Sequence, residues 1–513
     1  MSDLAGQVRD GYAFDGAALD LGALVVDGRG DPGAKVRIPL GMLNRHGLVA
    51  GATGTGKTKT LQVIAEQLSA AGVPVFLADI KGDVSGMSAP GSPNEKITAR
   101  AAEIGQDWQP AAYPVEFYAL GGRGTGIPVR ATITSFGPVL LSKVLGLSDV
   151  QSSSLNLIFH FADANGLPLL DVKDLRSVIQ YLVSGEGAEQ LRSLGGLSKP
   201  TAGVLLRELV AFSDAGADDF FGEPEFDTAD LMRTAPDGRG VASILELPGV
   251  VAQPALFSSF LMWLLADLFQ DLPEVGDVDK PKLVFFFDEA HLLFKDASKD
   301  FLQSITQTVR LIRSKGVGVF FVTQTPKDVH PDVLAQLGNR VQHALRAYTP
   351  DDAKALKATA STFPHSAYDL EEVLTKLGTG EAIVTVLSEN GAPTPVAWTR
   401  LRAPQSLMGA ADPAAMTAVV QGSPLHAKYA EPVDRESAYE KLAARLERPS
   451  TGSYPQGSPV PETPPAQSYP QEPNMMEKVL GSSATKSFIR AAATAAGAAI
   501  ARQIFGTARR RRR

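Results

Sequence analysis

Residues 47–58 read Gly-Leu-Val-Ala-Gly-Ala-Thr-Gly-Thr-Gly-Lys-Thr, a short apolar run that passes directly into a G-x-x-x-x-G-K-[ST] pattern. After this pattern, apolar residues recur at helical spacing through residue 71. A strand, a glycine-rich loop and a helix form the context in which the pattern binds phosphate, whereas a chance match in a Gly/Thr-rich turn lacks that context. The stretch therefore predicts a P-loop.

The residue types of this loop suit a polyphosphate. Glycines let successive N–H groups point at the phosphates, and the helix N-terminus adds partial positive charge. Lys57 is expected to reach the β- and γ-phosphates, and the Thr58 hydroxyl to take a Mg²⁺ position. ATP with Mg²⁺ is the predicted ligand pair. The predicted nucleotide-binding residues are Gly51, Thr53, Gly54, Thr55, Gly56, Lys57, Thr58 and Lys59.

A second apolar run, residues 283–287, ends in a pair of carboxylates. A continuous run of this kind is typical of a central parallel strand buried on both faces. At the end of such a strand, Asp288 would hold Mg²⁺ and Glu289 would polarise the attacking water as general base. The alternative is that Asp-Glu only caps the following helix.

Further polar residues follow other predicted strands. Gln324 follows the run 317–322 and would sense the third phosphate, unless it is an ordinary loop glutamine. Arg340 and Arg313 lie on segments that we expect to border the ligand end of the sheet, where either would neutralise transition-state charge from its own or a neighbouring subunit. Surface ion pairs are the alternative for both. Asp79 and Lys81, after the run 75–78, are either functional or part of a solvated loop.

Strand-like and helical segments alternate from residue 41 to 403. This alternation predicts an α/β fold with a doubly wound, mainly parallel sheet. Apolar residues have helical spacing over about 136–235, which indicates an insertion rather than a separate domain because strand-like segments resume afterwards. We expect a small β element at 1–40, a C-terminal extension at 404–448, a Pro/Ser-rich linker at 449–473 and a basic Ala/Arg-rich tail at 474–513.

Composition excludes several classes of function. The chain of 513 residues has no cysteine, so disulfides, thiol catalysis and Cys-based zinc sites are excluded. Its seven histidines offer no H-x-x-x-H spacing, which argues against a metalloenzyme of that type. We expect no signal peptide, since the first twenty residues lack an apolar segment, and no membrane span. A cytoplasmic location is the corresponding expectation.

Charge is distributed unevenly along the chain. Residues 474–513 carry nine Lys and Arg against Glu477, a net charge of +8, which leaves −15 for the rest of a chain whose total is −7. An acidic body argues against a DNA-coating protein but allows a local basic lining. The tail also carries an apolar stripe from Phe488 to Phe505, which would lie on an anionic membrane or on DNA, or else would be a solvated charged tail.

Five motifs together resemble the HerA/FtsK superfamily of ring-forming ATPases, and among them bacterial HerA-like proteins of the YjgR type. The motifs span about residues 40–400, and their combination is more specific than any one of them. They are residues 51–58, Asp79-Ile80-Lys81-Gly82-Asp83, Phe287-Asp288-Glu289-Ala290-His291, Val322-Thr323-Gln324-Thr325-Pro326 and Gly338-Asn339-Arg340-Val341.

The resemblance implies a RecA-like motor core, a hexameric ring, Mg-ATP, movement on double-stranded DNA and a protein partner such as a nuclease. By this resemblance, Lys57 and Thr58 would contact phosphate and metal, and Asp288 and Glu289 would act on metal and water. Gln324 would be the phosphate sensor, and Arg340 or Arg313 would be the arginine finger. The sequence departs from archaeal HerA because its N-terminal β-barrel is at most a remnant at 1–40. Residues 288–291 also spell the DEAH of another helicase group, but a second RecA domain is missing.

Two functions compete on the sequence alone. The first is an ATP-driven DNA translocase or helicase, favoured by the complete hydrolysis set. The second is an oligomeric ATPase that remodels or scaffolds protein partners without moving on nucleic acid, favoured by the acidic body. Salt-sensitive DNA binding would separate the two.

Overall fold

One mixed β-sheet runs through the described part of the chain. The computed structural model describes residues 2–447 except 193–194, 251–252, 277, 295–296 and 298. Within these ranges the sheet has twelve strands in the order β2-β1-β12-β11-β10-β3-β9-β8-β4-β7-β5-β6. The strands are β1 Ala18–Val26, β2 Arg29–Pro39, β3 Gly47–Ala50, β4 Val75–Asp79, β5 Val115–Leu120, β6 Ile127–Val129, β7 Ala242–Glu246, β8 Leu283–Phe287, β9 Val317–Thr323, β10 Asn339–Gln342, β11 Glu381–Thr385 and β12 Ala397–Leu401.

The strands from β10 to β6 in this order are parallel, and the rest pair antiparallel. β8 lies between β9 and β4, and all five of its residues are buried. Its phenylalanines stack across the sheet, with Phe285 against Phe76 at 4.2 Å between ring centroids and Phe287 against Phe321 at 5.4 Å. Burial on both faces is what the continuous apolar sequence of a parallel strand requires. The predicted α/β, mainly parallel fold class is confirmed.

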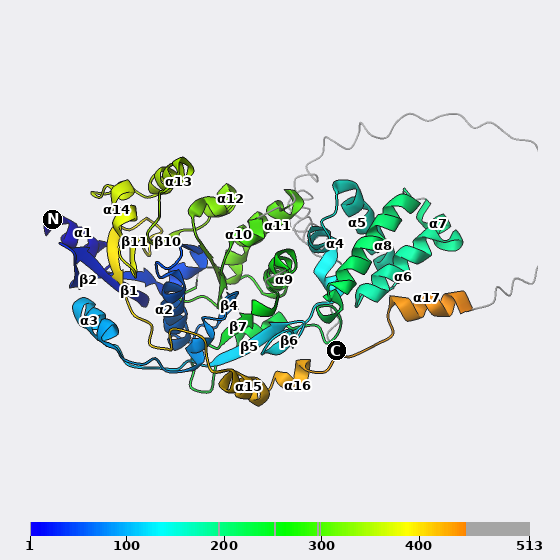
Figure 1. The fold of residues 1–513 in the computed structure, drawn as a ribbon, viewed down its shortest axis with the longest axis horizontal. Coiled ribbons are helices and arrows are strands. Elements are labelled where there is room, and N and C mark those ends of the chain that lie inside the picture. Colours follow the sequence, from blue (N-terminus) through cyan, green and yellow to red (C-terminus); the bar gives the residue numbers. More distant parts are fainter. Residues whose placement is uncertain are drawn as a thin grey trace, which may run out of the picture.

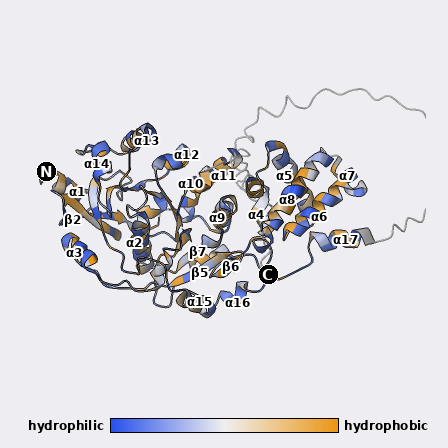
Figure 2. Ribbon diagram, viewed as in Figure 1, coloured by the Kyte–Doolittle hydropathy of each residue, from blue (hydrophilic) through white to orange (hydrophobic). Residues whose placement is uncertain are grey.

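Helices cover the sheet, and a further group of helices lies beyond its β6 edge. The insertion α4–α8 forms a helical group beside β6, and α4 packs on α9 (Figure 1). Hydrophobic residues gather on the strands and inner helix faces, and hydrophilic residues on outlying helices such as α13 (Figure 2). The helices are α1 Ser2–Gly11, α2 Lys57–Ala70, α3 Glu95–Ile104, α4 Ile133–Val144, α5 Asp149–Ala164, α6 Val172–Val183, α7 Gly185–Arg192, α8 Lys199–Asp214, α9 Pro254–Asp271, α10 His291–Phe294, α11 Lys299–Ile312, α12 Pro331–Leu334, α13 Pro350–Ala360, α14 Leu370–Lys376, α15 Pro413–Gly422, α16 His426–Tyr429 and α17 Ala438–Glu447.

Some local predictions differ from the structure. The N-terminal helix α1 and the short strand β6 were not expected. β1 and β2 belong to the main sheet, because β1 pairs with β12. β10 is short and ends at Gln342; the His343 N–H still donates to Ala50 O at 2.7 Å, at the point where β3 ends and the P-loop begins.

The segment after β12 runs back across the molecule to the helical insertion (Figure 1). It first crosses α2, where the buried Glu66 carboxylate accepts hydrogen bonds from the N–H groups of Gln405 and Ser406, both at 2.9 Å. It ends with α17 against α6, where Asp174 accepts a hydrogen bond from the Tyr439 N–H at 2.9 Å. The segment therefore ties the P-loop helix to the insertion. The division into separate units stays a prediction, and the linker and the basic tail lie outside the described residues.

No described helix combines the length and the apolar character that crossing a lipid bilayer demands.

Candidate active site

The P-loop follows β3 and is hydrogen-bonded to the segments at the ends of β9 and β10. β3 ends at Ala50, and the next two N–H groups donate to the neighbouring segments, Gly51 to Thr323 O at 3.2 Å and Ala52 to Ala344 O at 2.8 Å. Gly51 has φ +154°, and a Cβ there would come within 2.5 Å of His343 Cβ, so only glycine fits. These contacts fix where the loop begins.

The P-loop lysine points back into its own loop. Lys57 Nζ donates to Gly51 O at 2.7 Å and to Ala52 O at 3.2 Å, and the side chain is buried. Burial lowers the pKa of Lys57, while the charges of Glu289 and Asp288 act in the opposite direction. Both carboxylates therefore lie within electrostatic range of the P-loop lysine, although more than 230 residues separate them from it in sequence.

Other predicted loop residues differ in what they face. Thr53 and Gly54 are exposed, and Gly54 has φ +79° with open space where a Cβ would stand. Thr55 Oγ1 donates to Ala52 O at 2.7 Å, which holds the loop closed on itself. The Lys59 ammonium lies 3.3 Å from Gln62 Oε1 and feels the charges of Asp83 and Asp79. Its phosphate contact stays a prediction, as do those of Gly56, which precedes α2, and of Thr58, in the first turn of α2.

The carboxylate pair stands at the carboxyl end of β8. Asp288 is buried, its Oδ1 accepts the Glu289 N–H at 2.9 Å, and its Oδ2 has no hydrogen-bond partner among the described residues. Burial and the charge of Glu289 raise the pKa of Asp288 to about 7. Glu289 has φ +48°, a left-handed conformation that a glutamate adopts only under constraint. A buried, unpartnered carboxylate oxygen suits a cation ligand, because a bound cation would restore its ionised form.

Sheet order brings these groups to one edge. β10, β3, β9, β8 and β4 are adjacent and parallel, so their carboxyl ends meet there. That edge carries the P-loop after β3, exposed Gln324 after β9, Asp288 and Glu289 after β8, and Lys81 after β4. Lys81 Nζ is 2.9 Å from Glu289 Oε1, so this lysine contacts the predicted general base.

The two candidate arginines lie elsewhere. Arg313 begins the turn that precedes β9, at the amino edge of the sheet, so the prediction that it borders the ligand end of its own sheet is wrong. A strand of seven residues such as β9 is about 20 Å long, so its amino end lies about that far from its carboxyl end. Arg340 pairs in register with Leu48, inside the sheet, and its guanidinium donates to Thr362 O at 3.0 Å. Action of either arginine on a neighbouring subunit stays a prediction.

Sequence reasoning missed one residue beneath the P-loop. His343 Nε2 lies 2.9 Å from Thr60 Oγ1 on α2, and the ring is fully buried. Burial and the nearby Lys57 lower the pKa of His343 to about 3, so its ring is neutral. No local pattern marks this histidine, because its role depends on the pairing of β10 with β3.

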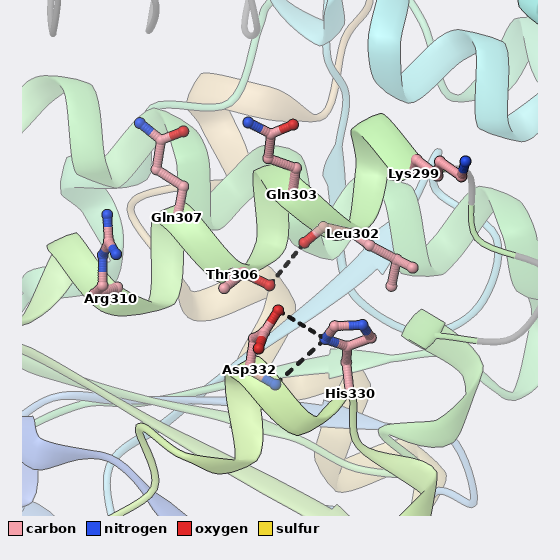
Figure 3. A pocket seen from close by; sticks show the side chains of 8 residues that line it. All are labelled: Lys299, Leu302, Gln303, Thr306, Gln307, Arg310, His330 and Asp332. Carbon is pink, nitrogen blue, oxygen red and sulfur yellow. Dashed lines mark hydrogen bonds and ion pairs between the residues drawn. The ribbon is translucent and has the colours of Figure 1, made fainter.

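A separate polar pocket of about 430 Å³ lies between α11 and α12 (Figure 3). Lys299, Gln303, Gln307 and Arg310 line it along α11, and His330 and Asp332 face them from the start of α12 (Figure 3). α11 lies in the connection from β8 to β9, after α10, so the pocket is on the segment that joins the strand before Glu289 to the strand before Gln324.

Among the described residues, no cluster of three or more His, Cys, Asp or Glu side chains is placed to hold a metal ion. A magnesium site of the predicted kind does not need such a cluster, because it uses one carboxylate and one hydroxyl beside the phosphates.

A protein-family model described as "Helicase HerA-like C-terminal" matches residues 25–513, nearly the whole chain. This chain belongs to the HerA-like helicase C-terminal family. The resemblance inferred from the five motifs is thereby confirmed.

Curated relatives of this HerA-like chain share limited identity. A probable helicase of Methanocaldococcus jannaschii is 34% identical over 118 residues, which is 22% of this chain and 21% of the relative. The DNA double-strand break repair helicase HerA of Sulfurisphaera tokodaii is 22% identical over 352 residues, which is 68% of this chain and 64% of the relative. The chain thus aligns with about one fifth of the first relative and with less than two thirds of the second.

Among solved structures, the plasmid coupling protein TrwB in complex with ADP and Mg²⁺ superposes on the HerA-like chain with a TM-score of 0.52. The match covers 80% of this chain and 94% of TrwB at 16% identity, and therefore speaks to the fold alone. A crystal form of TrwB with sulphate gives a TM-score of 0.51.

Proposed function

We propose that this chain is a Mg-ATP hydrolase that assembles into a ring and moves on double-stranded DNA. The observation that carries the proposal is the common edge of β3, β9 and β8, where the P-loop, Gln324 and the Asp288-Glu289 pair converge. Membership of the HerA-like helicase family supports the same conclusion, and the names of its relatives suggest DNA as the partner.

The residues of this edge fit Mg-ATP. Gly54 leaves open space at the loop, Lys57 is held beside it, and Asp288 Oδ2 is buried without a partner. Lys57 and the loop N–H groups would hold the phosphates, and Thr58 with Asp288 would hold Mg²⁺. When bound, Mg²⁺ would neutralise charge on the phosphate oxygens. Glu289 would accept a proton from water, and Gln324 would orient that water by hydrogen bonding.

Hydrolysis is tested first. Lys57→Ala is expected to abolish ATP binding and turnover, because it removes the cation that holds the phosphates. Glu289→Gln is expected to retain binding of ATP but to lower turnover by about 10²- to 10⁴-fold, the range for loss of a general base. Lys96→Met, which removes an exposed lysine of α3, is the matched control. Wild-type turnover in the Glu289→Gln variant would refute the assignment.

DNA is tested by stimulation. ATP turnover of the wild type is expected to rise when linear duplex DNA is added, and DNA affinity to fall steeply with salt. A rate indifferent to DNA would instead favour the protein-remodelling ATPase, which the acidic composition of residues 1–473 supports. Electron micrographs with ATP and duplex DNA test the ring and its subunit number.

The polar pocket on α11 offers a contact surface for a phosphate backbone. Lys299 and Arg310 stand eleven residues apart on α11, about 16 Å along the helix, with the amides of Gln303 and Gln307 between them. Cations that neutralise phosphates make binding salt-dependent. The double change Lys299→Ala, Arg310→Ala is expected to reduce DNA stimulation and the salt slope while basal turnover persists. Unchanged stimulation would exclude this surface.

A role for the basic tail, a nuclease partner and a cytoplasmic location are further proposals. Truncation after Pro473 tests the tail, because loss of lipid or duplex DNA binding is expected if residues 474–513 lie on an anionic surface. Unchanged binding to both would leave a solvated tail.

A further inference from the structure

One ion pair links the proposed general base to a lysine that follows β4. Lys81 Nζ lies 2.9 Å from Glu289 Oε1. The Glu289 side chain is 11% exposed, whereas that of Lys81 is 47% exposed. The base is therefore enclosed, while its cationic partner has solvent-filled space in which to turn.

The backbone that carries Lys81 is held firmly. The buried Asp79 carboxylate accepts hydrogen bonds from the N–H groups of Lys81 at 3.2 Å, Gly82 at 2.8 Å and Val84 at 2.8 Å. The Asp79 carbonyl accepts the Leu247 N–H at 2.9 Å, which ties the loop to the end of β7. Because the backbone of Lys81 is fixed and its side chain is half-exposed, the ammonium group can change position while the loop stays in place.

The backbone of Glu289 is held in one conformation. Its left-handed φ of +48° and the hydrogen bond from its N–H to Asp288 Oδ1 restrict the backbone. Oε2 has no hydrogen-bond partner, although His291 Nδ1 is 3.4 Å away. The Lys81 ammonium occupies the place beside Oε1 that an attacking water would need. Oε1 becomes accessible to that water only when Lys81 leaves it.

We propose that Lys81 is a positioning residue that exchanges the Glu289 carboxylate for the terminal phosphate of a bound nucleoside triphosphate. The inference rests on the proposed function, since it requires the triphosphate to lie on the P-loop at the same sheet edge. A triphosphate carries more negative charge than one carboxylate and would attract the exposed ammonium. Glu289 Oε1 is then open to the attacking water only when the third phosphate is present.

A simple structural ion pair is the alternative, and nucleotide discrimination separates the two. The affinities of wild type and Lys81→Met for ADP and for a non-hydrolysable ATP analogue are measured by titration calorimetry. The variant is expected to lose about tenfold in affinity for the analogue and less than twofold for ADP. Lys81→Arg, which keeps the cation, is expected to restore much of the difference, and Lys96→Met to behave as wild type.

A second arm tests the exchange itself. Glu289→Gln removes the competing charge, so it is expected to bind the analogue more tightly than wild type. In the Lys81→Met background, Glu289→Gln is expected to have no such effect, because the cation that it frees is absent. Thermal unfolding of each variant checks that the fold persists.

Several results would overturn the proposal. An equal loss of affinity for ADP and for the analogue would mark Lys81 as structural, and unchanged affinity for both would make it a bystander. Independent effects of the two substitutions would exclude exchange. If wild type binds both nucleotides but does not hydrolyse ATP, the proposed function fails, whereas the affinity ratio still reports on Lys81.

Discussion

Replacing Glu66 by alanine is expected to release the segment after β12 from the helix that carries the P-loop. Glu66 lies on α2 with 3% of its surface exposed, and its carboxylate accepts the N–H groups of Gln405 and Ser406 at 2.9 Å each, as well as the Ser406 hydroxyl. The substitution leaves these donors without an acceptor in the interior.

The expected cost follows from those donors. Each buried N–H left unpaired costs about 1–3 kcal/mol, and water entering the vacated space recovers part of this. We therefore expect a local loss of about 3 kcal/mol. Since 1.4 kcal/mol is a factor of ten, the two amides would exchange their hydrogens about 100-fold faster. Locally opened segments show this as loss of protection while the rest of the fold persists.

Hydrogen exchange read by mass spectrometry over residues 403–411 is the assay. Glu208→Ala, which removes an exposed glutamate from α8, is the matched control and is expected to leave this peptide unchanged. Wild-type exchange over residues 403–411 in a folded Glu66→Ala variant would refute the reasoning. An equal increase along the whole chain would also refute it, since that pattern reports global unfolding.

Three further predictions concern stability. Burial and the neighbouring Asp79 raise the pKa of Glu246 from 4.5 to about 8, so between these values the folded state holds a proton that the unfolded state has lost, and stability falls as pH rises. Glu246→Gln removes this term, and the gain in its melting temperature over wild type is expected to grow from pH 5 to pH 8; a constant difference would contradict it. Asp79→Asn replaces one acceptor oxygen by a donor facing the N–H groups of Lys81, Gly82 and Val84, and urea unfolding is expected to show a loss of about 2 kcal/mol, whereas an unchanged midpoint would exclude the carboxylate as the group that holds this loop. Gly47→Ala would place a methyl group 2.2 Å from Phe320 Cε1 and is expected to cost about 1–3 kcal/mol by overpacking, while Gly6→Ala, with open space around it, serves as control; equal stability of the two variants would count against the packing argument.

Much of the fold could be predicted because its signals are local. The runs at 47–50 and 283–287 match β3 and β8, whose apolar residues were enough to mark them as buried strands. The direction of β11 and β12 could not be predicted, since a strand's own sequence does not say which neighbour it will pair with or in which direction. The same limit explains why β1 and β2 were not assigned to the main sheet.

The sequence by itself determined the chemistry available to this protein: a phosphate loop, two carboxylates after a buried strand and the polar residues after its neighbours. These signals are encoded by residues close together in the chain, where spacing and side-chain type decide the local conformation. Only the tertiary structure decided which groups meet. It joined Lys81 to Glu289, set His343 beneath the P-loop and put Arg313 at the opposite edge, because strand order and long-range packing, rather than local pattern, bring distant segments together.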